Sequence, residues 1–204
     1  MSGRPPLRAA AAGATIAILA LVVLAADQFT KQLAISALPE REAVPVVGDA
    51  LQWYLVYNPG AAFSFGEGVT WIFTIAMAAV AAGIVWLAAT RIRSRLWAVV
   101  LGLLLGGVLG NLTDRLFRDP GFAVGHVVDF ILTPWMWFWT TPAIYNVADM
   151  FIVTMMIAVA VLVLVGIGFD GRRERRAPAD PASATDASTT EAPAADEGTA
   201  ERPA

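Results

Sequence analysis

The chain of 204 residues contains no cysteine, a single histidine and a single lysine. The lack of cysteine excludes disulfide bonds, thiol nucleophiles, thiolate metal sites and a lipid-modified cysteine on this chain. One histidine excludes a metal centre built from several imidazoles. Charged residues are also scarce, at 15% against about 25% in soluble proteins. With 57% hydrophobic residues and a mean hydropathy of +0.63, the composition is typical of a membrane protein and excludes a soluble single-domain enzyme.

Four uncharged segments are long enough to cross a bilayer, which takes about 20 apolar residues. They are residues 9–26, 69–90, 96–112 and 150–169. Because lipid offers no partner for the backbone of an open strand, we expect all four to be transmembrane helices. The first segment also fits a cleavable signal peptide, but its length and the even number of helices favour a retained helix.

Arginine and lysine are distributed unevenly around these segments, which predicts their orientation in the membrane. One side holds nine basic residues: Arg4, Arg8, Arg91, Arg93, Arg95, Arg172, Arg173, Arg175 and Arg176. The other side holds only Lys31, Arg41, Arg115 and Arg118 near the segment ends. We therefore expect both termini to be cytoplasmic, with two outer loops at about 27–68 and 113–143.

The outer loops contain two features with structural meaning. Residues 44–57 combine β-branched and aromatic residues with turn signals, which predicts short strands in a small sheet on the outer face. Residues 134–139 contain three tryptophans, which favours an interfacial segment that either anchors the protein or gates its substrate. The predicted fold is an all-α membrane protein of four transmembrane helices, with a small extracytoplasmic β element and an interfacial aromatic segment.

The end of the chain has a different composition. Residues 177–204 lack valine, isoleucine, leucine, methionine and all aromatic residues. Such a sequence buries too little apolar surface to offset the entropy lost on ordering. We therefore expect two regions, a transmembrane domain at 1–170 and a disordered cytoplasmic tail at 171–204.

Polar residues that are costly at membrane depth gather at the outer ends of the predicted helices. They are Asp27, Lys31, Asn58, Asn111, Asp114, Arg115, Asp129, Asn146 and Asp149. Asn111, Asp114 and Arg115 share one face if the third helix continues through them, because they lie three and four residues apart. Asn146 and Asp149 are likewise three apart, at the start of the fourth helix. Several helices thus direct polar groups toward one place.

Most of these residues also have a purely structural interpretation. Asp27 and Lys31 are four apart, which favours an ion pair on one helix. Asp114 and Arg115 could cap the end of a helix. Asn58 begins an Asn-Pro-Gly sequence, which is typical of a turn.

Two further features are most simply structural. His126 is expected to be a loop residue. Gly102, Gly106 and Gly110 are spaced four apart, the pattern that lets transmembrane helices pack closely. We therefore predict close helix packing along the third helix rather than a phosphate-binding loop.

Asp129 and Asp149 are the strongest candidates for chemistry, since each lies in an apolar stretch without an adjacent basic residue. Two carboxylates that share a site cannot both ionise comfortably, so one should hold a proton near neutral pH. Such a pair suits peptide hydrolysis: the ionised group takes a proton from the attacking water and the protonated group supplies one to the carbonyl oxygen or leaving amine.

The residues alone leave other functions open. Carboxylates at membrane depth are often proton relays in transporters, although here they cluster at one face and the helices show no repeat. A divalent cation could bind Asp114, His126, Asp129 and Asp149 through oxygen and imidazole ligands. A non-enzymatic membrane scaffold is a third possibility.

Five motifs in order resemble those of lipoprotein signal peptidase (signal peptidase II). They are Asp27-Gln28-x-x-Lys31, Asn58-x-Gly60-Ala61-Ala62-Phe63-Ser64, Gly106-Gly107-x-x-Gly110-Asn111-x-x-Asp114-Arg115, Val127-Val128-Asp129-Phe130 and Tyr145-Asn146-x-Ala148-Asp149. The resemblance covers residues 9–169. Each motif is weak alone, but five in order on a four-helix chain of this length are specific.

The resemblance implies an aspartic protease of the bacterial cytoplasmic membrane that is inhibited by globomycin and needs no metal or other cofactor. It implies removal of the signal peptide from prolipoproteins, just before a cysteine that already carries diacylglycerol. Asp129 and Asp149 match the catalytic pair. Asp27, Lys31, Asn58, Asn111, Asp114, Arg115, Asn146 and Ala148 match substrate-binding or site-supporting positions. Its partners would be lipid-modified prolipoproteins and membrane lipids, with no nucleic acid, and we expect a monomer.

The chain departs from the family pattern at three places. Residues 117–125 form a longer connection than in compact members, Tyr145 stands where phenylalanine is usual, and Met150 stands where a small residue is usual. None of these changes removes a catalytic group. Other intramembrane aspartic proteases fit less well, because they usually place the aspartates deeper within helices.

Overall fold

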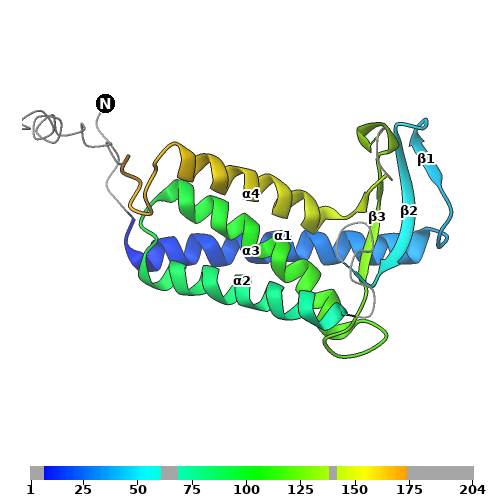
Figure 1. Ribbon diagram of the computed structural model, residues 1–204, viewed down its shortest axis with the longest axis horizontal. Coiled ribbons are helices and arrows are strands. Elements are labelled where there is room, and N and C mark those ends of the chain that lie inside the picture. The colour runs from blue at the N-terminus through cyan, green and yellow to red at the C-terminus, as the bar shows by residue number, and fades with distance from the viewer. Residues whose placement is uncertain (1–6, 61–68, 138–141, 174–204) are drawn as a thin grey trace, which may run out of the picture. The chain divides into compact units, whose positions relative to one another are not determined.

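The computed structural model describes residues 7–60, 69–137 and 142–173, and in these ranges four helices are long and apolar enough to cross a membrane. They are α1 (Ala9–Ala37), α2 (Thr70–Thr90), α3 (Arg95–Phe117) and α4 (Val147–Leu164). The helices run side by side in a bundle, and one end of this bundle carries a small sheet (Figure 1). The four predicted helices are therefore confirmed.

The sheet is antiparallel and larger than the sequence predicts. Its strands, in spatial order, are β1 (Val44–Val47), β2 (Leu51–Asn58), β3 (Val127–Leu132) and β4 (Ile144–Tyr145). Strands are confirmed within 44–57, but Asp129 lies in β3 rather than in a loop. The fold is thus four helices plus a sheet assembled from two chain segments, and the description all-α is too narrow.

The predicted aromatic segment begins as a short 3-10 helix at Pro134–Trp137. Phe138 and Trp139 lie outside the described residues, as does most of the predicted tail at 171–204. An interfacial position for the aromatic segment and disorder of the tail remain predictions.

Two helices extend further toward the sheet than their uncharged segments. α1 continues to Ala37, so Asp27 and Lys31 lie inside the helix rather than at its end. α3 continues to Phe117, so Asp114 and Arg115 do not cap it. These buried charges are tolerated because Asp27, Lys31 and Asp114 form ion pairs and Arg115 donates hydrogen bonds to backbone carbonyl groups, as described below.

The fourth helix is displaced relative to its predicted span of 150–169. α4 begins at Val147, after the cap residue Asn146, and ends at Leu164. Gly166 follows with a φ of 74°, a left-handed conformation that glycine adopts without strain and that often terminates helices. The apolar residues up to Phe169 therefore leave the helix although their composition would allow it to continue.

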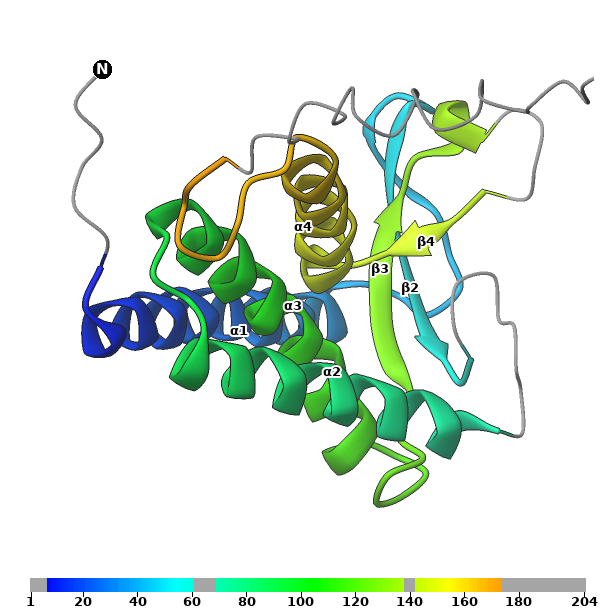
Figure 2. The same cartoon turned by 60° about the vertical axis from the view of Figure 1, so that its left-hand side comes forward.

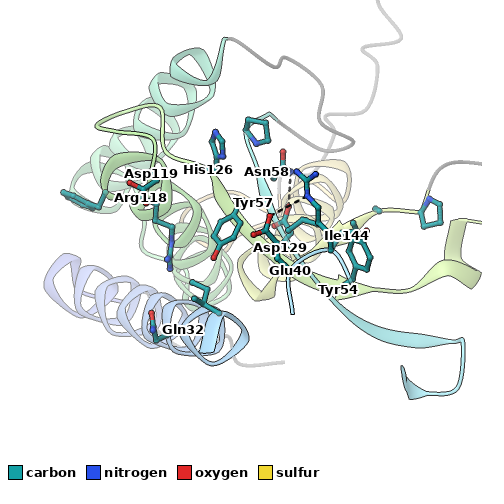
Figure 3. Close-up of a pocket in the computed structure, with 17 residues that line it drawn as sticks. Gln32, Glu40, Tyr54, Tyr57, Asn58, Arg118, Asp119, His126, Asp129 and Ile144 are labelled. Atoms are coloured by element: carbon teal, nitrogen blue, oxygen red, sulfur yellow. Dashed lines mark hydrogen bonds and ion pairs between the residues drawn. The ribbon is translucent and has the colours of Figure 1, made fainter. Parts of the chain in front are cut away.

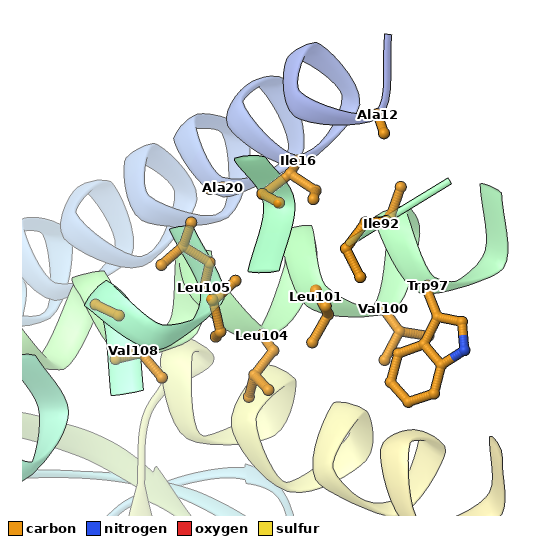
Figure 4. Packing of buried hydrophobic residues seen from close by; sticks show 14 of the residues in the cluster. Ala12, Ile16, Ala20, Ile92, Trp97, Val100, Leu101, Leu104, Leu105 and Val108 are labelled. Atoms are coloured by element: carbon orange, nitrogen blue, oxygen red, sulfur yellow. The ribbon is translucent and has the colours of Figure 1, made fainter. Parts of the chain in front are cut away.

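α3 is the central helix of the bundle. Leu101, Leu104 and Leu105 of α3 belong to one buried apolar cluster with Ile16 of α1, and Figure 4 shows α3 between α1 and α4 with Leu104 on the side of α4. The outer helices instead expose apolar side chains, which in a membrane protein face lipid. Examples are Leu21, Ile75 and Val163.

The glycines of α3 allow α1 to approach closely, as the spacing predicts. A Cβ atom on Gly106 would lie 2.5 Å from Cβ of Val23 and 2.8 Å from the carbonyl oxygen of Ala20. A Cβ atom on Gly110 would lie 2.5 Å from Oδ2 of Asp27. The second contact places the backbone of α3 directly against a buried carboxylate of α1.

We expect Gly106→Ala to destabilise the protein by about 1–3 kcal/mol, because the added methyl group must push α1 and α3 apart. The measurement is thermal unfolding of the purified protein in detergent. Gly83→Ala on α2 is the matched control, since a Cβ there meets no described atom within 4 Å. Equal melting temperatures for the two variants would contradict the close-packing argument.

Candidate active site

A groove of about 1370 Å³ opens at the sheet end of the bundle. Asp129, Asn58 and Tyr57 lie in its middle part (Figure 3). The other lining residues are Gln32, Ile35, Glu40, Arg41, Tyr54, Val56, Pro59, Phe117, Arg118, Asp119, His126, Pro142, Ala143 and Ile144.

Asp129 is a buried carboxylate on β3, with 3% of its surface exposed. Its Oδ2 accepts a hydrogen bond from Nδ2 of Asn58 at 3.0 Å, and its Oδ1 accepts one from Nδ2 of Asn146 at 2.7 Å. Burial, followed by the negative charge of Asp149, raises the pKa of Asp129 to about 7. The two amide donors oppose this rise but do not cancel it.

Asp149 lies in the first turn of α4 and forms a capping box with Asn146. The backbone N–H of Asp149 donates to Oδ1 of Asn146 at 3.0 Å, and the backbone N–H of Asn146 donates to Oδ2 of Asp149 at 3.0 Å. Oδ1 of Asp149 accepts from Nδ2 of Asn111 at 2.7 Å. Asn146 therefore contacts both aspartates, and Figure 2 shows the start of α4 beside β3.

Lys31 lies at the centre of a buried charge cluster. Its Nζ is 2.8 Å from Oδ2 of Asp27, which confirms the predicted ion pair. It is also 2.7 Å from Oδ2 of Asp114 and 2.9 Å from Oδ1 of Asn111. All three ammonium protons thus have acceptors. Because Lys31 donates to the amide oxygen of Asn111, the amide nitrogen of Asn111 is directed toward Asp149.

The carboxylates of this cluster also hold the backbone next to each candidate catalytic residue. Oδ1 of Asp27 accepts from the N–H of Ala148, which precedes Asp149, at 2.9 Å. Oδ2 of Asp114 accepts from the N–H of Val128, which precedes Asp129, at 3.2 Å. One ion cluster therefore fixes the positions of α4 and β3 together.

Arg115 is 1% exposed and binds backbone carbonyl groups. Its NH1 donates at 3.0 Å to the oxygens of Asn58, Pro59 and Gly125, and its NH2 donates to the oxygen of Gly60. No ion pair of Arg115 occurs within the described ranges. Arg115 thus joins the end of β2 to the residues before β3, in keeping with a scaffold role.

The sequence analysis overlooked two polar residues of the cluster. Nε2 of Gln28 lies 3.2 Å from Asp27 and 3.1 Å from Asp114. Nε of Arg118 lies 2.6 Å from Oδ1 of Asp114. Gln28 follows Asp27 in a motif, which is a usable signal. Arg118 is four residues from Asp114, a spacing that places both on one face of a helix and is a second usable signal.

The alternative of a divalent-metal site is not supported by the geometry. Among the residues that the structure describes, no group of three or more histidine, aspartate or glutamate side chains is arranged to hold a metal ion. Asp114 instead forms ion pairs with Lys31 and Arg118. His126 lies in the loop before β3, as expected, and lines the groove.

The fold and this site define a class: a multi-pass helical membrane protein with two carboxylates, Asp129 and Asp149, that accept hydrogen bonds from one asparagine at one end of the bundle. Comparison with known proteins narrows the class, because the family described as Signal peptidase (SPase) II matches residues 19–165. The chain belongs to the signal peptidase II family of membrane proteases.

Its relatives carry the same family name. A lipoprotein signal peptidase of Leifsonia xyli subsp. xyli is 47% identical over 205 residues, covering 100% of this chain and 89% of the relative. That of Mycobacterium avium is 46% identical, covering 77% of this chain and 84% of the relative. That of Mycobacterium tuberculosis is 44% identical, covering 76% and 74%.

Two solved structures share the fold. Both are titled as bacterial membrane enzymes determined by the in meso method. One has a TM-score of 0.66 at 24% identity and covers 80% of this chain and 95% of its own. The other has a TM-score of 0.63 at 26% identity, with coverages of 74% and 93%.

Proposed function

We propose that the protein is an aspartic endopeptidase that removes the signal peptide from diacylglyceryl-modified prolipoproteins, just before the lipidated cysteine. The names of its relatives supply the substrate class. The observation that carries the aspartic mechanism is Asn146, whose side chain contacts Asp129 and whose backbone contacts Asp149. Of these three residues, Asp129 lines the groove. Because burial and the negative charge of Asp149 raise the pKa of Asp129, the two carboxylates can hold one proton between them.

In the proposed reaction, Asp129 and Asp149 act on one water molecule. The ionised member of the pair takes a proton from the water while the water oxygen forms a bond to the scissile carbonyl carbon. The protonated member donates to the carbonyl oxygen, and the C–N bond then breaks as the amine nitrogen receives a proton. The products are a signal peptide with a free carboxylate and a lipoprotein with a free amino group on its cysteine.

The remaining predicted site residues are proposed to position this pair. Asn58, Asn111 and Asn146 orient the carboxylates through the hydrogen bonds given above. Asp27, Lys31, Asp114, Arg115 and Ala148 hold the backbone on which the pair lies.

We further propose that the sheet end of the bundle faces the outside of the cell membrane, with both termini in the cytoplasm. A lipid-modified cysteine is anchored in the outer leaflet, so its scissile bond lies near that interface. Asp129 on β3 and Asp149 in the first turn of α4 would meet the bond there without carrying charge to the centre of the bilayer. The region 1–170 would then be the peptidase, active as a monomer, and 171–204 a cytoplasmic tail.

The direct test is cleavage of a purified prolipoprotein by the purified enzyme, with and without diacylglyceryl modification. We expect cleavage of the modified precursor only, inhibition by globomycin and no effect of EDTA. Inhibition by EDTA would contradict the aspartic mechanism. No cleavage of the modified precursor by a folded enzyme would favour the transporter alternative.

We expect kcat/KM to fall as the pH rises through about 7, the pKa of Asp129. Below this pKa the pair retains the shared proton, and above it both carboxylates are ionised and the acid is lost. A pH profile with an uncharged model substrate, alongside melting temperatures at each pH, measures the effect. A rate that keeps rising well above pH 7 would contradict the shared-proton mechanism.

A further inference from the structure

We propose that Glu40 and Arg41, at one end of the groove, recognise the charge of the first residues that follow the cleavage site in the substrate. The inference rests on the proposed function and extends it to substrate selection. It concerns the part of the precursor that becomes the mature lipoprotein.

Asp129 lies in the middle part of the groove. Arg118, Asp119 and His126 lie on one side of it, and Glu40 lies close to it on the side that leads toward Tyr54 (Figure 3). An extended peptide whose scissile bond is at Asp129 therefore has room on both sides.

The position of Glu40 and Arg41 indicates which part of a substrate reaches them. They belong to the connection between α1 and β1, which lies beyond the sheet and away from the bundle (Figure 1). The apolar signal segment of a precursor stays in the bilayer beside the bundle, because its transfer to water is unfavourable. The polar mature segment leads away from the bundle, and this direction takes it along the end of the groove that Glu40 and Arg41 line.

The turn that carries Arg41 is defined by its backbone. Arg41 has a φ of 59°, in the left-handed region that favours glycine, yet the chain has a charged residue there. Its N–H donates to the carbonyl oxygen of Leu55 on β2 at 2.9 Å, and the backbone of Glu40 forms an isolated parallel β-bridge with the same residue. The contacts with β2 thus fix the backbone of Glu40 and Arg41 beside the groove.

The charges of the two residues are available to a ligand. Nε of Arg41 lies 3.6 Å from Oε1 of Glu40, and the side chains are 75% and 53% exposed. An exposed ion pair at this distance contributes little to stability and exchanges readily for other partners. Arg41 can therefore pair with an acidic residue of the substrate, and Glu40 with a basic one.

The test uses three lipid-modified precursors that differ only at the two residues after the cysteine, which are both aspartate, both asparagine or both lysine. We expect Arg41→Gly to raise KM for the aspartate precursor about two- to fivefold relative to the asparagine precursor, with kcat unchanged. Glycine adopts a positive φ without strain, so this variant keeps the turn. We expect Glu40→Gln to have the same effect on the lysine precursor.

Glu42→Gln is the matched control. It makes the same charge change as Glu40→Gln, two residues from Glu40. Glu42 is exposed and is not part of the groove lining in the described ranges. Its KM ratios should equal those of the wild type. If Arg41→Gly and Glu40→Gln also leave the ratios unchanged while the wild type cleaves all three precursors, the inference is wrong and the proposed function stands. A folded wild type that cleaves no precursor would overturn both.

Discussion

Asp129→Asn and Asp149→Asn should each lower kcat for prolipoprotein cleavage by about a thousandfold, in keeping with the loss of general acid–base catalysis. An asparagine keeps the size of the side chain and one acceptor oxygen, so contacts with Asn146 and Asn111 can persist in part. It cannot ionise, and therefore cannot exchange a proton with water or the leaving amine. The measurement is single-turnover cleavage of the diacylglyceryl-modified precursor.

Asp119→Asn provides the matched control for this experiment. Asp119 lines the same groove as Asp129 but has no contact with the carboxylate pair in the part of the chain that the structure describes. Its variant should retain kcat within a fewfold of the wild type. Wild-type activity in either the Asp129 or the Asp149 variant would mean that the catalytic pair is assigned wrongly.

The second large effect is expected from Lys31→Met, which should destabilise the protein by about 3–5 kcal/mol. Methionine fills most of the volume of the lysine side chain but leaves Asp27 and Asp114 buried without their shared counter-ion. An unpaired buried carboxylate is far more costly than an unpaired exposed one. Thermal unfolding of the detergent-solubilised protein, followed by tryptophan fluorescence, measures the loss of stability.

Two comparisons test the physical reason for this loss. Arg41→Met removes the cation of an exposed pair and should cost less than about 1 kcal/mol. Combining Lys31→Met with Asp27→Asn should restore part of the stability, because the unpaired charge of Asp27 is then gone while Asp114 keeps its ion pair with Arg118. If the double variant is less stable than Lys31→Met by the full cost of Asp27→Asn alone, the two residues are not coupled and the argument from the ion pair is wrong.

The sequence by itself determined the four helices and most residues of the site, though not Gln28 and Arg118. A single long uncharged segment is stable in lipid as a helix, so the number of transmembrane helices follows from the number of such segments in the sequence. The Asp27–Lys31 pair and the common face of Asn111, Asp114 and Arg115 follow from helical spacing, and both are present in the structure. The glycine spacing of α3 likewise predicted its close approach to α1.

The tertiary structure alone decided how these groups are joined. Asp129 is held in a strand because β2 pairs with β3 across a long stretch of sequence, a pairing that no local pattern indicates. Lys31 has a second carboxylate partner in Asp114, and Asn146 joins Asp129 to Asp149. Periodicity identifies the side of a helix on which a residue lies but not the element packed against it. The contacts that assemble the centre depend on packing between distant segments, and are therefore absent from the linear pattern.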